Sequence, residues 1–189
     1  MINFKFYQKE IVNEKLFEYP CVDSNGRFLD CRKTIAFNTG GYINTSKLEA
    51  LGAEVYIDPQ NLDMAYPRIG IVAPIEINET NEKAYYQILD YYIHTLQTIT
   101  HKMGASKGYN HIVVLLPPGA NQCHSDLEGM AYYAVYGLIQ GLGAIYAPKG
   151  IFINGIVLSE INNVELTTDW TAYLASDNAC NMVGQVICL

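Results

Sequence analysis

The stretch Met130–Val157, MAYYAVYGLIQGLGAIYAPKGIFINGIV, decides the fold of this 189-residue chain. Apolar residues recur at helical spacing from Leu127 to Tyr146, and the turn residues Pro148-Lys149-Gly150 then end the helix. The apolar run Ile151–Val157 that follows has the length of a buried strand. A long helix that leads into a buried strand is typical of one crossover of a parallel sheet, so the stretch indicates an α/β protein.

The same alternation of helices and strands extends to both sides of this stretch. Before it, a long helix over Asn78–Met103 and a strand over His111–Leu116 repeat the pattern. The other expected elements are the strands Lys33–Phe37, Glu54–Ile57, Ile69–Ile77 and Gln185–Leu189 and the short helices Thr45–Leu51 and Asp169–Ala175. We therefore expect a Rossmann-like, doubly wound parallel sheet with helices on both faces, in a single domain over residues 33–189. Residues 1–32 are expected to form an N-terminal arm or a hairpin.

Apolar stripes on the two long helices predict which faces are buried. The stripe of the first helix comprises Ile88, Leu89, Tyr92, Ile93, Leu96, Ile99 and Met103, and that of the second comprises Leu127, Met130, Ala131, Ala134, Val135, Leu138, Ile139, Leu142 and Ile145. Gly137 and Gly141 lie beside the second stripe, where we expect them to allow close backbone packing. In the short helix that Gly52 ends, Thr45 or Ser46 is the expected N-cap.

The composition excludes several classes of function. The net charge is −7, and no cluster of Lys and Arg is present to neutralise a phosphate backbone, so no nucleic-acid partner is expected. No apolar run is long enough to cross a bilayer, and the first residues have no signal-peptide core, so we expect a cytoplasmic protein without a membrane partner. Only 16% of the residues are charged, which favours an oligomer.

No metal site is predicted from the cysteines and histidines. The five cysteines are odd in number and none form a C-x-x-C pair, so they are expected to be reduced. Cys123, His124 and Asp126 lie together, but such close ligands on one loop do not give the spacing of a zinc site. His94 and His101 share one face of the first long helix and are expected at a surface or an interface.

Three pieces of the sequence, in order, resemble the short-chain dehydrogenases/reductases. The first is the helix Asn78–Met103 followed by HIVVLL, and the second is the helix with Tyr132-x-x-x-Tyr136 that runs into Ala147-Pro148-Lys149-Gly150-Ile151. The third is Tyr173–Ala179 followed by Val183-Gly184-Gln185-Val186. The resemblance implies a Rossmann-like fold, a nicotinamide cofactor, and Tyr132 as the proton-transferring tyrosine. It also implies that Tyr136 replaces the lysine that lowers the pKa of that tyrosine.

The positions that would hold the cofactor depart from the family pattern. Thr39 and Gly40 match the start of the phosphate-binding loop, but Asn44 and Ser46 stand where the next two glycines belong. Asp58 ends the second strand, where an acid would meet the adenosine ribose, although an Asp before Pro is also an ordinary turn residue. We interpret Thr39, Gly40 and Asp58 as vestiges of the family's site, and expect no cofactor to bind.

The catalytic positions and the adenine side of the sheet also depart from the pattern. Tyr92 stands at the position of the catalytic Asn, and Pro117-Pro118-Gly119 covers that of the Ser, so Tyr132 is the one catalytic group that remains. Between Asp58 and Arg68 the chain is too short for the strand that supports the adenine side, so the domain is expected to be truncated relative to the family.

Three hypotheses follow. The first is a non-catalytic subunit that assembles through helices 78–103 and 127–146 with an active short-chain reductase, or with itself as a scaffold. The alternative is an active NAD(P)-dependent reductase of carbonyl or ketoacyl substrates, with a site rebuilt around Tyr132 from His124, Ser125 and Asp126. The third is a binding module with a residual pocket at the carboxyl edge of the sheet.

Overall fold

The computed structural model describes residues 29, 32–58, 67–75, 82–104, 108–122, 126–161 and 163–189. They form a six-stranded sheet in the order β2-β1-β3-β4-β5-β6, and every neighbouring pair is parallel. The strands are β1 (Lys33–Phe37), β2 (Glu54–Ile57), β3 (Ile69–Val72), β4 (Asn110–Leu116), β5 (Ile151–Val157) and β6 (Val186–Cys188). The predicted Rossmann-like α/β architecture is therefore confirmed.

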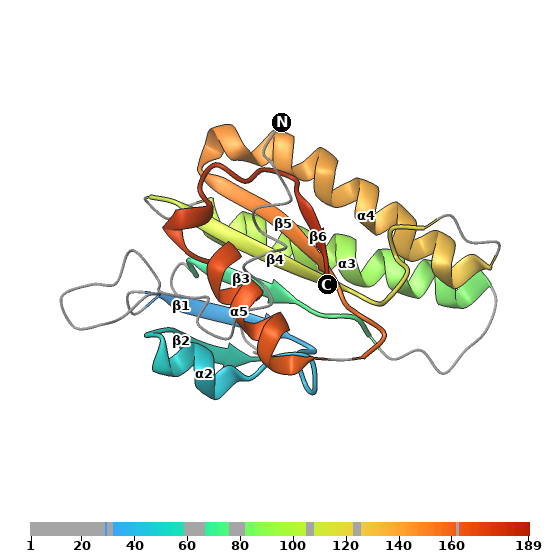
Figure 1. Ribbon diagram of the computed structural model, residues 1–189. Helices are drawn as coiled ribbons and strands as arrows, with labels where there is room; N and C mark the ends of the chain where they lie inside the picture. The colour runs from blue at the N-terminus through green and yellow to red at the C-terminus, as the bar shows by residue number, and fades with distance from the viewer. Residues whose placement is uncertain are drawn as a thin grey trace.

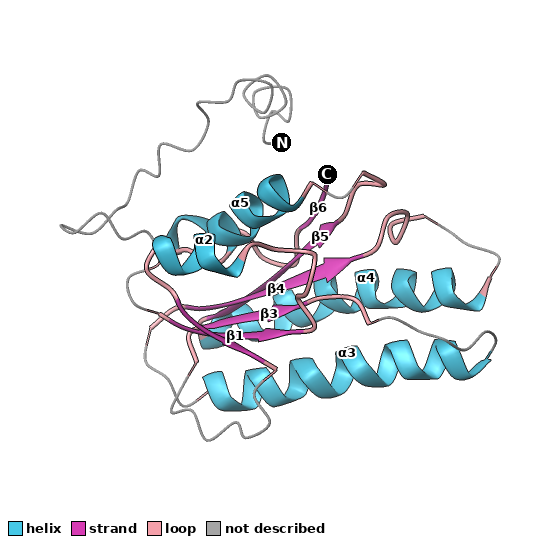
Figure 2. Cartoon of the chain, turned by 90° about the horizontal axis from the view of Figure 1, so that it is seen from below, coloured by secondary structure: helices cyan, strands magenta, loops and turns pink. Residues whose placement is uncertain are grey.

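Helices cover both faces of this sheet, as Figures 1 and 2 show. One face carries the short helix α2 (Thr45–Ala50) and α5 (Val164–Leu174), and the other carries the long helices α3 (Glu82–Met103) and α4 (Leu127–Tyr146). Two apolar clusters fill the layers between helices and sheet. Because both faces are covered, β3, β4 and β5 are buried along their whole length, which explains their nearly continuous apolar sequences.

The order of the strands reverses between β1 and β3. The chain runs from β1 through α2 to β2 on one side, and then returns to place β3 on the other side of β1. In open parallel sheets, ligands bind outside the carboxyl ends of the strands at such a point. The fold thus directs attention to the residues that follow β1 and β3.

Helix α5 begins earlier than the sequence predicted, at Val164 rather than Asp169. The β-branched residues of its first turns have low helix propensity, which hid this part from sequence reasoning. Asn163 compensates as the N-cap, because its side chain accepts a hydrogen bond from the N–H of Leu166 at 3.1 Å. Thr168 is also buried, so tertiary packing stabilises the first turns of this helix.

Two other local predictions need correction. The N-cap of α2 is Asn44 rather than Thr45 or Ser46. Strand β3 ends at Val72, and residues 73–75 are a loop. The rest of the strand predicted to Ile77, and residues 78–81 of the predicted helix, lie outside the described residues.

The apolar stripe predicted for α4 divides into two faces. Ala131, Val135 and Ile139 pack against the sheet, as expected. The members of the stripe that are exposed instead are Leu127, Met130, Ala134 and Ile145. A side chain at Gly137 or Gly141 would meet nothing within 4 Å, so neither glycine is required by packing within the described chain.

The glycine of α4 that does allow close packing is Gly143, which sequence reasoning did not single out. A Cβ atom built on Gly143 would lie 2.5 Å from the backbone nitrogen of Gly184 and 3.2 Å from the carbonyl oxygen of Ile153. The carboxyl-terminal part of α4 therefore lies directly against the segment that leads into β6.

Two predictions on chain organisation fall on residues that the structure does not describe. Of residues 1–32, only Leu29 and Arg32 are described; Leu29 is buried, and its N–H donates to the carbonyl oxygen of Leu51 at 2.8 Å. Residues 59–66, where the missing strand was inferred, are also outside the described part. The N-terminal arm, the domain boundary and the truncation thus remain predictions.

Candidate active-site region

The carboxyl ends of β1, β2 and β3 are connected by hydrogen bonds at the point where the strand order reverses. The side-chain amide of Asn38, the residue after β1, donates to the carbonyl oxygen of Pro74 after β3. The backbone N–H of Asn38 donates to Oδ1 of Asp58 at 2.8 Å. Asn38 and Asp58 have φ angles of 53° and 40°, in the left-handed region that Asn and Asp tolerate better than most residues. The Asp58 carboxylate is thus engaged in joining two strand ends.

The loop after β1 is closed by its own side chains. Thr39 is buried, and its carbonyl oxygen accepts from the N–H of Tyr42 at 3.1 Å. Gly40 is exposed, and a side chain there would meet nothing within 4 Å. Oδ1 of Asn44 accepts a hydrogen bond from the N–H of Lys47 at 3.2 Å. A glycine at this position, as in the family pattern, would leave that N–H without a side-chain partner, whereas Asn44 caps it.

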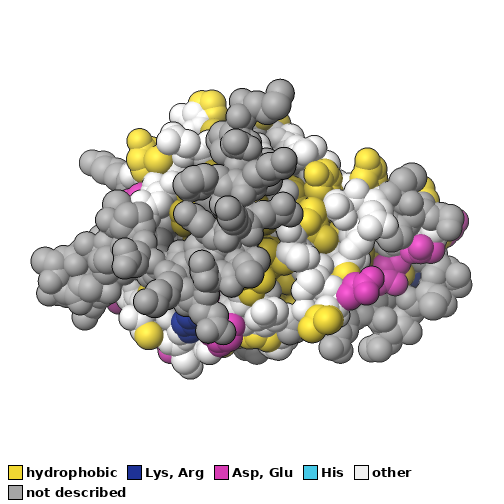
Figure 3. All heavy atoms as spheres, in the orientation of Figure 1, with side chains coloured by type: hydrophobic (Ala, Val, Ile, Leu, Met, Phe, Trp, Pro, Cys, Tyr) yellow, Lys and Arg dark blue, Asp and Glu magenta, His cyan; other side chains and the backbone are white. Residues whose placement is uncertain are grey.

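A group of charged side chains joins this loop to α5. Nδ2 of Asn44 donates to Oε1 of Glu165 at 3.1 Å. Nζ of Lys47 lies 2.9 Å from Oε2 of Glu165 and 2.7 Å from Oδ1 of Asp169. Hydrogen bonds from Asn44 and Lys47 lower the pKa of Glu165, so its carboxylate is charged at neutral pH. The group thus holds two acidic side chains and one lysine. Where the described residues form the surface of the face that carries α5, Figure 3 shows a small basic patch with an acidic patch beside it.

Tyr132 is a buried phenol with aromatic neighbours. It is 5% exposed, and its ring lies edge to face with that of Tyr92, with the centroids 6.2 Å apart. Burial, followed by the negative charge of Glu128, raises the pKa of Tyr132 above its ordinary value. Its phenol is therefore a weaker acid than an ordinary tyrosine and a poor proton donor.

Tyr136 stands at the position of the family lysine and carries no positive charge that could lower the raised pKa of Tyr132. Tyr136 is partly buried, and its ring stacks on that of Tyr133 with the centroids 6.1 Å apart. The nearest downstream lysine, Lys149, lies with Nζ 4.9 Å from the ring centroid of Tyr146 at the other end of the helix. Replacement of the lysine by Tyr136 thus removes the charge on which proton transfer by a tyrosine depends.

Two neighbouring tyrosines of α3 complete the aromatic cluster. The hydroxyl of Tyr92 donates to the carbonyl oxygen of Leu115 in β4 at 2.9 Å, and that of Tyr91 donates to the carbonyl oxygen of Ala73 at 3.1 Å. Burial raises the pKa of both phenols. The structure brings Tyr92 and Tyr132 together, as the family positions imply. Sequence reasoning did not single out Tyr91, although its position next to Tyr92 in the sequence could have indicated that it belongs to the same cluster.

The residues of the alternative rebuilt site are only partly described. Cys123, His124 and Ser125 lie outside the described residues. Asp126 is the N-cap of α4, because its Oδ1 accepts from the N–H of Gly129 at 2.7 Å. In the described part of the chain, no group of three or more His, Cys, Asp or Glu side chains is placed to hold a metal ion.

None of the described helices is long and apolar enough to cross a membrane.

No protein-family model matches the sequence, and no curated protein matches it. Solved structures do match. An enoyl-[acyl-carrier-protein] reductase (NADH) from Aquifex aeolicus has a TM-score of 0.71 at 15% identity, over 85% of this chain and 95% of that one. A short-chain dehydrogenase/reductase mutant from Serratia marcescens has a TM-score of 0.67 at 13% identity, over 86% and 98%. This chain has the short-chain dehydrogenase/reductase fold.

A second enoyl-acyl carrier protein reductase with the dehydrogenase fold, from Bacillus cereus, was solved with NADP+. Its TM-score is 0.68 at 12% identity, over 86% of this chain and 96% of that one. At these identities the likeness establishes the fold of this chain, which includes the sheet order, the paired long helices and the closing segment. Which chemistry this chain performs depends on its own residues.

The dehydrogenase fold implies a nicotinamide dinucleotide, and the residues present do not fit one. Asn44 stands at a glycine position, and its side chain caps the helix end that a pyrophosphate would approach. The carboxylate of Glu165 lies 3.1 Å from that same side chain, so a pyrophosphate there would meet a negative charge. Asp58, which would meet the ribose, is hydrogen-bonded to Asn38.

Proposed function

We propose that this protein is a non-catalytic subunit with the dehydrogenase fold that acts by assembly, with an active short-chain reductase or with a second copy as a scaffold. The observation that carries the proposal is the exposed apolar face of α4. The proposed loss of catalysis is supported by the buried Tyr132, whose raised pKa makes it a poor proton donor, and by the capped, acidic loop after β1.

The exposed face of α4 has the composition of a contact surface. Tyr133 and Ile145 are 47% and 60% exposed, and Met130 lies on the same side of the helix. Gly137 and Gly141 border open space, so another helix can approach the backbone of α4 there. Glycines inside a helix cost about 1 kcal/mol each relative to alanine, a cost that close packing with a partner would explain.

The adjacent helix extends this surface. Helix α3 packs along α4 on the same face of the sheet, and its Tyr86 is 61% exposed. In the short-chain dehydrogenases/reductases, as the resemblance implies, the two corresponding helices pair with those of another subunit. A partner with the same fold would therefore cover the exposed apolar side chains of both helices at once.

Charge on the exposed face of α4 should break the assembly. We expect the wild-type chain to be a dimer by size-exclusion chromatography with light scattering, or to copurify with an active reductase. In the double variant Met130→Glu/Ile145→Glu, the dissociation constant should rise at least about 100-fold, because the carboxylates would be buried without partners.

The control is Ile161→Glu, which adds one of the two carboxylates of the double variant at a residue that is 85% exposed and lies between β5 and α5. This variant should assemble like the wild type. A wild-type chain that is monomeric at micromolar concentration and copurifies with no reductase would contradict the proposal.

Restoring the family lysine should not restore catalysis. The variant Tyr136→Lys is expected to show no turnover of NADH or NADPH with keto substrates, because the loop after β1 would still exclude the dinucleotide. Absorbance at the nicotinamide band measures turnover, and fluorescence titration of the wild type with NADH and NADPH measures binding. Micromolar binding with turnover by the wild type would favour the active reductase built around Tyr132, and turnover only in Tyr136→Lys would show that one lost group had inactivated the site.

A further inference from the structure

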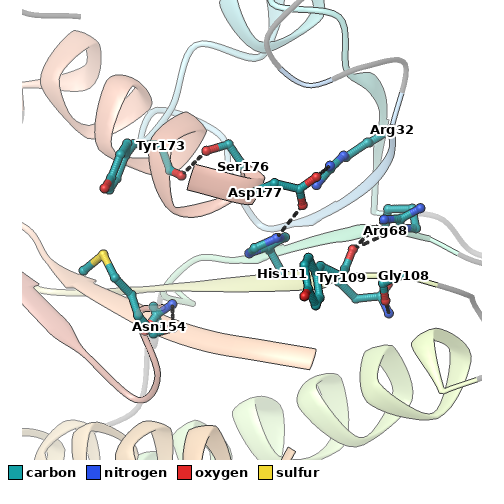
Figure 4. Close-up of polar contacts among 11 residues, drawn as sticks. Arg32, Arg68, Gly108, Tyr109, His111, Asn154, Tyr173, Ser176 and Asp177 are labelled. Atoms are coloured by element: carbon teal, nitrogen blue, oxygen red, sulfur yellow. Dashed lines mark hydrogen bonds and ion pairs between the residues drawn. The ribbon is translucent and has the colours of Figure 1, made fainter. Parts of the chain in front are cut away.

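Three side chains meet at the amino end of the sheet, as Figure 4 shows. Arg32 precedes β1, His111 lies near the start of β4, and Asp177 begins the short helix η2 (Asp177–Ala179). Oδ2 of Asp177 pairs with Nη2 of Arg32, and Oδ1 of Asp177 lies 3.4 Å from Nε2 of His111. We name residues 175–182 the η2 segment; Asp177 joins it to the sheet.

The histidine of this cluster is completely buried. Its ring stacks on that of Phe152 in β5, with the centroids 5.4 Å apart. When Nε2 donates to Asp177, Nδ1 is left as an acceptor. Among the described residues, Nδ1 of His111 has no hydrogen-bond partner. Protonation of His111 would therefore create a buried N–H without an acceptor, which costs about 1–3 kcal/mol.

The charges around His111 act in opposite directions on its protonation. Asp177 on η2 favours the proton, while Arg32 before β1 and Arg68 before β3 oppose it. Burial is the largest influence, and the pKa of His111 is lowered from its ordinary value. The guanidinium of Arg68 is held close by because it donates to the carbonyl oxygen of Tyr109 at 3.0 and 2.7 Å.

The η2 segment makes polar side-chain contacts with the sheet at two places, and its buried Ala175 and Ala179 pack in the apolar cluster on this face of the sheet. At its far end, Asn154 of β5 donates from Nδ2 to the carbonyl oxygen of Met182 at 3.0 Å. At its near end, the described polar side-chain contacts with the sheet residues are those of Asp177 with Arg32 and His111. Opening of the near end would bring water to His111, whose pKa would then return to about 6.5.

We propose that Arg32, His111 and Asp177 form a proton-sensitive latch that holds the η2 segment on the sheet and releases it when His111 takes up a proton. The closed form has a pKa for His111 below that of the open form, so the open form binds more protons as the pH falls. The latch is fully closed above the ordinary histidine pKa, and it weakens as the pH falls below about 6.5 towards the lowered value.

Hydrogen exchange measured by mass spectrometry tests the latch, because three amides report on this segment. The N–H groups of Ala179, Cys180 and Met182 donate to carbonyl oxygens within it, at 3.1, 3.2 and 2.9 Å. After correction for intrinsic exchange, their protection factors in the wild type should fall about tenfold between pH 8 and pH 5. In His111→Gln they should not change with pH. In the control His94→Gln, which removes an exposed histidine of α3, the fall should match the wild type.

Two results would overturn the latch. One is a wild-type protection factor in the η2 segment that stays constant from pH 8 to pH 5. The other is the same fall in His111→Gln as in the wild type, which would assign it to other groups. If His111→Gln does not fold, NMR titration of the wild-type histidines decides the question. A His111 ring that titrates near pH 6.5 excludes the latch, and one that titrates at a lower pH, together with the fall in protection, supports it.

Discussion

Replacing Gly143 with alanine is expected to lower the free energy of unfolding by about 3 kcal/mol. The new Cβ would lie 2.5 Å from the nitrogen and 2.6 Å from the Cα of Gly184. These are backbone atoms, so no side-chain rotation can relieve the contact. Gly184 itself has a φ of +62°, and its N–H donates to the carbonyl oxygen of Ile153 at 3.0 Å. Moving it would therefore also disturb the connection to β6.

Gly137→Ala is the matched control, because it makes the same change in the same helix. Within the described chain its new methyl group meets nothing within 4 Å, so the unassembled chain should gain up to about 1 kcal/mol from helix propensity. Chemical denaturation at a fixed chain concentration measures both variants, and light scattering shows whether the oligomeric state has changed. Equal stability of the two variants would refute the close contact between α4 and Gly184.

Asn154→Leu is expected to cost about 1–3 kcal/mol, because it removes two part-buried hydrogen bonds from a buried side chain to the backbone. Asn154 is fully buried in β5. Nδ2 of Asn154 donates to the carbonyl oxygen of Met182, and Oδ1 accepts from the N–H of Gln185, both at 3.0 Å. Leucine has a similar size, so the loss should come from the hydrogen bonds rather than from a cavity.

The control for this variant is Asn121→Leu. Asn121 is exposed, and its Nδ2 contacts Sγ of Cys188 at 3.3 Å, so its loss should change stability by less than about 0.5 kcal/mol. Urea denaturation compares the two variants. In Asn154→Leu, the amide hydrogen of Gln185 should also exchange with solvent faster than it does in the wild type. If Asn154→Leu were as stable as Asn121→Leu, Asn154 would not be what holds the segment before β6.

Local patterns were sufficient for the central part of the fold. The helical spacing of Ile88, Tyr92, Leu96 and Ile99 correctly placed the buried face of α3, since a helix on a sheet has one apolar side. The apolar runs of β4 and β5 indicated strands covered on both faces. For α4, by contrast, the apolar residues exceed what the sheet can cover, and the spacing alone does not separate the covered side from the exposed one.

Features that depend on contacts between distant residues were not predictable. Gly143 differs from Gly137 and Gly141 only in the segment that lies against it, which the sequence does not reveal. The contact between Tyr92 and Tyr132 could be predicted through the family resemblance. The bond between Asn38 and Pro74 could not, because it depends on the loop conformations after two strands.

The contacts of the final segment have a consequence for folding during synthesis. Residues 175–189 cover His111, hold the side chain of Asn154, and bring Asp177 to Arg32, which was made 145 residues earlier. Until these residues leave the ribosome, polar groups at the amino end of the sheet lack their final partners and an apolar face stays uncovered. We therefore expect the nascent chain to stay incompletely packed until its last strand has been made, and to need protection from aggregation until then.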